Sequence, residues 1–141
     1  MSKVTFVIGL SGSGKTHMVD GMTGVRKIQE SFFARKDEFF AAITAGEDCV
    51  VSERAFLRKA NQEAIVREIL ATAPDTEIEW FCFENNLEKA NRNCRRERKD
   101  KQPGSEAAHM AMNAMESPLY TYPAGAAILP IWSGDEEENG G

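Results

Sequence analysis

Residues 9–16 combine glycines, a lysine and a hydroxyl at a spacing that can hold a chain of phosphates. They match the pattern G-x-x-x-x-G-K-[ST] in full, and they follow an apolar run, Lys3–Ile8, that is typical of a buried strand. The glycines let the backbone wrap an anion, Lys15 is expected to reach the β- and γ-phosphates, and Thr16 is expected to hold Mg²⁺. The residues predicted to bind ATP are Gly9, Ser11, Gly12, Ser13, Gly14, Lys15, Thr16 and His17.

Three carboxylates lie where they could complete such a site. Glu53 follows the apolar run 49–52, and an acid at the end of a strand could hold Mg²⁺ directly or through water. Glu30 ends a possible strand over residues 25–30 and could accept the proton of an attacking hydroxyl. Asp37 is the competing base, although its position favours a helix N-cap. The sequence leaves the choice between Glu30 and Asp37 open.

Residues 92–101 hold six basic side chains against two acidic ones, a local charge of +4. Arg92 and Arg96 are four residues apart and therefore share one face of a helix, and the same is true of Arg95 and Lys99. This face could be solvated, or it could close over phosphates as a lid whose arginines neutralise charge. A Pro-Gly pair at 103–104 suits a hinge, so we predict a lid over about residues 88–105.

The segments alternate between strand-like and helix-like patterns along the chain. Strands are predicted over 3–8, 25–30, 49–52, 78–83 and 126–132, and helices over 14–21, 37–45, 61–71, 87–98 and from 105 onward. This alternation predicts a three-layer α/β domain over residues 1–133, with a mainly parallel five-stranded sheet in the order 2-3-1-4-5. Residues 134–141 read as an acidic, disordered tail, and without its four acids the net charge of −5 becomes −1.

Composition and motifs also exclude several classes of protein. No apolar run is long enough to cross a bilayer, and neither a signal-peptide pattern nor a disulfide framework is present, so a cytoplasmic protein is expected. The base-reading N-K-x-D of a GTPase switch is missing, and 141 residues are too few for a large ATPase motor. A small phosphotransferase or a non-catalytic nucleotide-binding module remains, in an oligomeric state that the sequence leaves open.

From residue 4 to about residue 115 the chain resembles the small P-loop kinases of the polynucleotide 5′-hydroxyl kinase type, including those of bacteriophages. The resemblance rests on residues 9–16, on residues 50–53 followed by a helix, and on the run 92–96 (Arg-Asn-Cys-Arg-Arg), which is similar to the family's lid sequence. The chain departs from the family in having Glu30 and Glu53 where an Asp is usual, and in lacking an Arg three residues after Glu30.

The resemblance implies a P-loop NTPase fold of the kinase type, with ATP and Mg²⁺ as cofactors. It implies that Lys15, Thr16, Arg92 and Arg96 take the family's roles at the transferring phosphoryl group. The favoured acceptor is then a nucleic acid, through a 5′-hydroxyl or the hydroxymethyl group of a modified base in phage DNA, in a bacterial or phage-infected cytosol. A nucleoside or another small molecule stays open as the alternative acceptor.

Deleting residues 135–141 should leave the melting temperature unchanged within error, because four adjacent acids followed by an Asn and two glycines cannot pack a core. Calorimetry on the full and truncated chains measures this. A clear drop would show that the tail docks on the folded body, and the basic segment 92–101 would be the first surface to examine.

Overall fold

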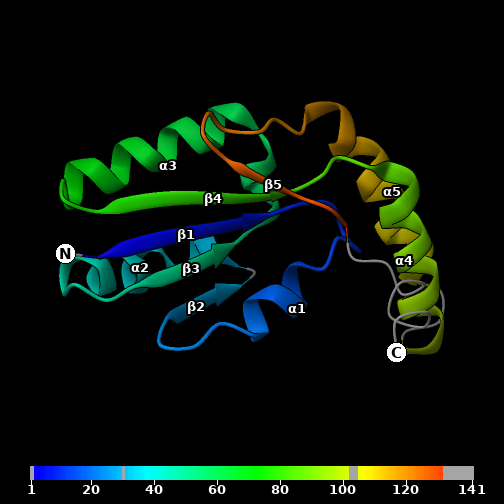
Figure 1. The fold of residues 1–141 in the computed structure, drawn as a ribbon, viewed down its shortest axis with the longest axis horizontal. Helices are drawn as coiled ribbons and strands as arrows, with labels where there is room; N and C mark the ends of the chain where they lie inside the picture. Colours follow the sequence, from blue (N-terminus) through cyan, green and yellow to red (C-terminus); the bar gives the residue numbers. More distant parts are fainter. Residues whose placement is uncertain (1, 30, 102–104, 132–141) are drawn as a thin grey trace.

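The computed structural model describes residues 2–29, 31–101 and 105–131, and the side chains of all of these except residues 97–101. Five parallel strands form one sheet in the order β2-β3-β1-β4-β5 within this part of the chain (Figure 1). The strands are β1 (Lys3–Ile8), β2 (Arg26–Gln29), β3 (Cys49–Ser52), β4 (Glu77–Phe83) and β5 (Ala127–Leu129). The predicted fold class and strand order are confirmed.

Strand β1 lies at the centre of the sheet, and its residues 4–8 are buried on both faces. Its residue Val4 pairs with Cys49 of β3 on one side and with Ile78 of β4 on the other. Phe6 is fully buried and stacks on Trp80, with ring centroids 4.1 Å apart. A strand that is buried on both faces requires helices on both sides of the sheet, as in other parallel sheets.

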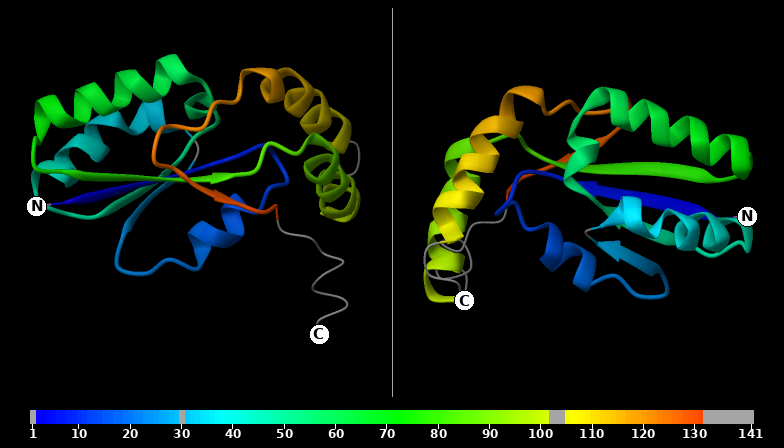
Figure 2. Two further views of the ribbon diagram at one scale, coloured as in Figure 1. Left: turned by 45° about the horizontal axis from the view of Figure 1, so that its top comes forward. Right: turned by 180° about the vertical axis from the view of Figure 1, so that it is seen from behind.

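The helices cover the sheet from both faces. They are α1 (Lys15–Asp20), α2 (Lys36–Thr44), α3 (Lys59–Thr72), α4 (Leu87–Lys101) and α5 (Ser105–Glu116), with short 3₁₀ turns η1 (Phe32–Arg35), η2 (Arg54–Leu57) and η3 (Ser117–Leu119). The connection from β1 to β2 runs across the sheet in the opposite direction to the later connections, so right-handed crossovers put α1 on one face and α2 and α3 on the other. Figure 2 shows this arrangement from two further sides.

Helices α4 and α5 pack side by side as a hairpin at one end of the sheet (Figure 1). This is the end at which β1, β3 and β4 finish, because parallel strands place their carboxyl ends at the same edge. None of the helices in the described ranges has the length and apolar composition that crossing a bilayer requires.

Local predictions were wrong in three places. The apolar pattern of residues 61–71 predicts a buried stripe of Ile65, Val66, Ile69 and Leu70. The side chain of Leu70 is instead 41% exposed, while the polar Gln62 is buried. Asp37 lies inside the first turn of α2 and is not its N-cap, because η1 leads directly into the helix and Arg35 occupies that position. Strand β5 is shorter than the predicted 126–132, whose last residue lies outside the described part of the chain.

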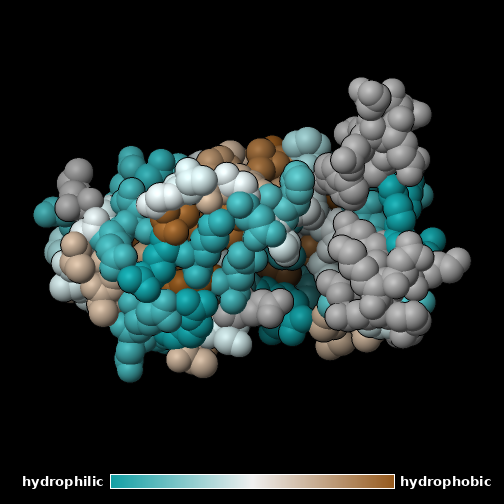
Figure 3. Space-filling view, turned by 90° about the horizontal axis from the view of Figure 1, so that it is seen from below, coloured by the Kyte–Doolittle hydropathy of each residue, from teal (hydrophilic) through white to brown (hydrophobic). Residues whose placement is uncertain are grey.

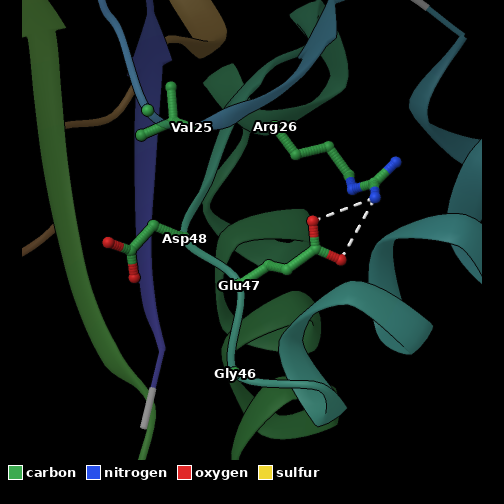
Figure 4. A pocket seen from close by; sticks show the side chains of 6 residues that line it. Val25, Arg26, Gly46, Glu47 and Asp48 are labelled. Carbon is green, nitrogen blue, oxygen red and sulfur yellow. Dashed lines mark hydrogen bonds and ion pairs between the residues drawn. The ribbon is translucent and has the colours of Figure 1, made fainter.

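A hollow at the opposite edge of the sheet lies where β2 and β3 begin, and the ion pair between Arg26 and Glu47 lines it (Figure 4). Arg26 donates to Glu47 at 2.9 Å and to Glu38 at 3.1 Å. The hydrogen bond from Arg35, together with that from Arg26, lowers the pKa of Glu38. These pairs therefore contribute stability above the ordinary value of 4.5 and lose it as the pH falls through the lower folded value. Arg26 and Glu47 of this hollow are therefore already paired with each other.

The face of the molecule drawn in Figure 3 is mostly hydrophilic, with apolar residues visible only as small patches between polar ones. Exposed single apolar side chains such as Phe33 and Ile128 are ordinary for a protein surface.

The thiols of Cys49 and Cys82 should be unreactive in the native protein. Burial raises the pKa of each to about 11, so only on the order of one thiol in a thousand is the reactive thiolate at pH 8. Titration with a disulfide reagent at pH 8 should be slow for the native protein and should reach all three cysteines in denaturant. Rapid native modification of two or more thiols would contradict the buried placement.

Candidate functional site

The loop between β1 and α1 curls back on itself as a compact turn. Gly12 and Gly14 have φ angles of 91° and 109°, the left-handed region that glycine adopts without strain. The backbone N–H of Ser13 donates to the carbonyl of Leu10 at 3.1 Å, and its hydroxyl donates to the same oxygen at 2.6 Å. These bonds fix the turn that the motif predicts.

Lys15 extends back over the start of this loop. Its Nζ donates to the carbonyl of Gly9 at 2.6 Å and to that of Leu10 at 2.9 Å. Carbonyl oxygens are weaker partners for an ammonium group than phosphate oxygens are, so an anion in the loop can compete for Lys15.

A cavity of about 450 Å³ opens beside the loop. Seven of the eight predicted ATP-binding residues line it, and the remaining one, Gly9, is buried beneath the loop. The far wall comes from the carboxyl ends of β2 and β3 and from helix α5, through Gln29, Ser52, Glu53, Arg54, His109 and Met112. The fold thus brings the loop, the predicted metal-binding acid and two strand ends to one cavity.

Glu53 is half-buried at the wall of this cavity. One of its carboxylate oxygens accepts from the backbone N–H of Arg54 at 2.9 Å and caps η2. The described residues contain no group of three or more His, Cys, Asp or Glu that could hold a metal by themselves. A Mg²⁺ ion held by Thr16 and Glu53 would therefore need phosphate oxygens and waters as its other ligands, as is usual for Mg²⁺.

Among the residues that the structure describes, those predicted as base and lid do not line the cavity. Glu30 lies outside the described residues, although its neighbour Gln29 lines the cavity. Asp37 is exposed and is not among the lining residues. Arg92 is exposed on α4 and also does not line the cavity, and the side chains of 97–101 and the expected hinge at 103–104 lie outside the described part.

Arg96 is linked to the loop through a second residue. Its Nη2 donates to Asn93 Oδ1 at 3.3 Å, and Asn93 Nδ2 donates to the carbonyl of Gly12 at 2.9 Å. Helix α4 therefore holds the loop by an amide, while Arg92 and Arg95 are exposed.

Several residues at this site were not predicted from the sequence. Arg54, which follows Glu53, contacts α5 through Glu116 at 3.7 Å, and its position after a functional acid was the one available signal. Asn93 and Asn113 are buried polar residues on α4 and α5, and asparagines inside helices carry no periodic signal. His109 Nδ1 lies 2.9 Å from the hydroxyl of Ser11.

No protein-family model and no curated protein sequence matches the chain. Among solved structures, the chain is similar to the crystal structure of a gluconokinase from Sinorhizobium meliloti 1021, with a TM-score of 0.55. The match covers 92% of this chain and 82% of that chain, at 15% sequence identity. At that identity the likeness concerns the fold, and the fold of this chain is that of the P-loop kinases.

Replacing Gly12 by alanine should damage the site more than replacing Gly24, although both glycines have positive φ angles. A Cβ at Gly12 would lie 2.4 Å from the carbonyl oxygen of Ala90 in α4, whereas a Cβ at Gly24 would meet nothing within 4 Å. Both variants carry backbone strain of about 1–2 kcal/mol, and Gly12→Ala adds an overlap costing about 1–3 kcal/mol.

Thermal unfolding of the two variants measures this difference, and Gly24→Ala is the matched control. Equal losses of stability would show that α4 does not press on the loop.

Proposed function

We propose that this chain is a kinase that transfers the γ-phosphoryl group of ATP to a hydroxyl group of a small molecule, with Mg²⁺ as cofactor. The observation that carries the proposal is the phosphate loop with Lys15, opening on a cavity of about 450 Å³ whose far wall carries polar side chains beside Met112. That volume lies within the range of roughly 300–1,000 Å³ usual for small-molecule sites.

In this proposal Lys15 changes partners when ATP binds. Its ammonium group leaves the carbonyls of Gly9 and Leu10 and pairs with the β- and γ-phosphates, where a positive charge stabilises the transferring group. The hydroxyl of Thr16 and the carboxylate of Glu53 would hold Mg²⁺, which would supply positive charge at the phosphate oxygens.

The acceptor enters from the side of β2 and β3. Gln29, Ser52 and Arg54 present amide, hydroxyl and guanidinium groups there, and these can hydrogen-bond a polar molecule. The acceptor oxygen forms the new bond to the γ-phosphorus as the bond between that phosphorus and the β–γ bridging oxygen breaks, and ADP leaves. The proton of the hydroxyl goes to a carboxylate, and Glu30, next to the lining residue Gln29, is our first candidate.

The lid remains part of the proposal. Arg92 and Arg96 would act on the transferring phosphoryl group after the outer part of α4 moves toward the loop, pivoting where Asn93 holds Gly12.

The choice of a small acceptor departs from the polynucleotide favoured by the sequence. The structural neighbour is described as a gluconokinase, and this supports a small-molecule acceptor more than a nucleic acid. The cavity has walls on both sides, as expected for enclosing a metabolite, whereas the basic side chains Arg92 and Arg95 lie outside it.

Incubation with γ-labelled ATP and Mg²⁺ across sugars, sugar acids, polyols, nucleosides and 5′-hydroxyl oligonucleotides tests the acceptor. Transfer to a sugar, sugar acid, polyol or nucleoside is expected. Transfer to oligonucleotides alone, with an acceptor KM that rises steeply between roughly 50 and 200 mM salt, would reassign the protein as a polynucleotide kinase. ATP binding without transfer to any acceptor would indicate a nucleotide-binding module.

Lys15→Ala should lower phosphoryl transfer by on the order of 10²–10³-fold while the protein stays folded, because Lys15 supplies charge and does not pack in the core. Lys59→Ala is the matched control: it also removes one positive charge, but from an α3 side chain that is 73% exposed. Initial rates with saturating acceptor measure both. A folded Lys15→Ala protein with near-normal turnover would overturn the kinase assignment.

A further inference from the structure

Asn113, on α5, is 1% exposed and makes hydrogen bonds with every polar group of its amide. Its Oδ1 accepts from the backbone N–H of Ser11 at 2.8 Å, and its Nδ2 donates to the carbonyl of the same residue at 2.9 Å. The second Nδ2 hydrogen goes to Asn91 Oδ1 at 3.1 Å. An asparagine amide has two donors and one acceptor oxygen, so the Asn113 side chain is satisfied in this position.

This amide bonds both backbone groups of one residue, its N–H and its C=O, as a paired residue of a neighbouring strand would. The bonded residue, Ser11, belongs to the loop that lines the cavity, and it lies 102 residues away in the sequence. Burying an amide costs free energy unless its hydrogen bonds are made, because each missing bond leaves a desolvated polar group. The position of the Asn113 amide therefore depends on the loop, and the loop's position depends on it.

Further contacts from the same helix hairpin reach Ser11 and the next loop residue, Gly12. His109 Nδ1 lies 2.9 Å from Ser11 Oγ, and Cys94 Sγ lies 3.2 Å from the carbonyl of Ser11. Asn93 Nδ2 donates to the carbonyl of Gly12 at 2.9 Å. The first half of the phosphate loop is thus held by α4 and α5 together, whereas Lys15 and Thr16 belong to α1.

A loop rich in glycine loses much conformational entropy when it is fixed for binding. External hydrogen bonds that hold it in the bound shape remove part of that cost from the binding step. The hairpin of α4 and α5 includes the predicted lid. Its hydrogen bonds to Ser11 and Gly12 therefore couple the position of the hairpin to the conformation of the loop.

We propose that Asn113 is a positioning residue for the nucleotide. It holds the backbone of Ser11 in the conformation that binds phosphate, so nucleotide affinity depends on how α5 packs. The inference rests on the nucleotide binding of the proposed function, but on neither the acceptor nor the transfer step.

The test compares Asn113→Ala with Gln62→Ala. Gln62 is the matched control because it is also a buried helix amide, 4% exposed, and it also donates to two backbone carbonyls, those of Phe56 and Thr121. It does not line the cavity beside the loop. Titration calorimetry with Mg²⁺·ATP and Mg²⁺·ADP gives the Kd of each variant, and thermal unfolding without nucleotide gives its stability.

We expect both variants to lose stability, and only Asn113→Ala to lose affinity, by about tenfold, which corresponds to about 1.4 kcal/mol. Gln62→Ala should bind within about twofold of the unchanged protein. An unchanged Kd in folded Asn113→Ala, or an equal loss of affinity in Gln62→Ala, would overturn the inference. The second result would make Asn113 a contributor to general stability.

His109→Ala keeps the test decisive if Asn113→Ala does not fold. His109 is half-buried, and its contact with Ser11 is through side chains, so a loss of about two- to fivefold in affinity is expected with little change in stability. Unchanged affinity in this variant would then overturn the inference. If the unchanged protein binds neither nucleotide, the proposed function fails with it, whereas normal binding that survives the substitutions defeats the inference alone.

Discussion

The backbone of the phosphate loop lies directly against the backbone of α4, and the arrangement of the site depends on this contact. Gly12 has no side chain, and a Cβ there would approach the carbonyl oxygen of Ala90 to 2.4 Å. The close approach lets Asn93 and Cys94 of α4 reach the loop carbonyls. Because α5 packs along α4, the same contact brings Asn113 within hydrogen-bonding distance of Ser11. One glycine therefore determines how the two halves of the chain meet.

The sheet supplies the other half of the site. Strand β1 is paired on both sides, so the loop leaves the sheet between the carboxyl ends of β3 and β4. The hydroxyl of Tyr120 donates to the carbonyl of Phe83 at 2.5 Å and lies 3.4 Å from that of Ile8, where β4 and β1 end. Burial raises the pKa of Tyr120 far above its ordinary value, so this hydroxyl keeps its proton and its donor role. Residues 29 and 52–54 then face the loop across the cavity.

On helix α4 the asparagines are buried or half-buried, whereas the arginines at 92 and 95 are exposed. The amides make internal contacts: Asn93 is 2% exposed and bonds the loop, and Asn91, half-buried, accepts from Asn113 of α5. Neutral amides can be buried once their hydrogen bonds are made, whereas guanidinium groups keep a large desolvation cost without a paired anion. A triphosphate is an anion with which a guanidinium group forms strong hydrogen bonds, as the proposed lid requires.

Much of the fold followed from local sequence patterns. The motif at 9–16 specifies its own turn through glycines and hydrogen bonds within the loop, and the apolar runs at 3–8 and 49–52 became strands with the predicted bounds. The strand order also followed, because a parallel sheet with right-handed crossovers allows few arrangements. These features depend on residues close together in the chain, or on the repeat of apolar residues along it.

The contacts that complete the site were decided by tertiary structure. The alanines of α5 at 107, 108, 111 and 114 are exposed, and the buried residue of that helix is the polar Asn113. Leu70 likewise lies at the surface although its helix pattern placed it in the core. An asparagine has the same local preferences whether it faces water or a loop 102 residues away. The packing of α5 on α4, and of α4 on Gly12, brings the Asn113 amide to the backbone of Ser11. No pattern within one segment of the sequence encodes this contact between distant residues.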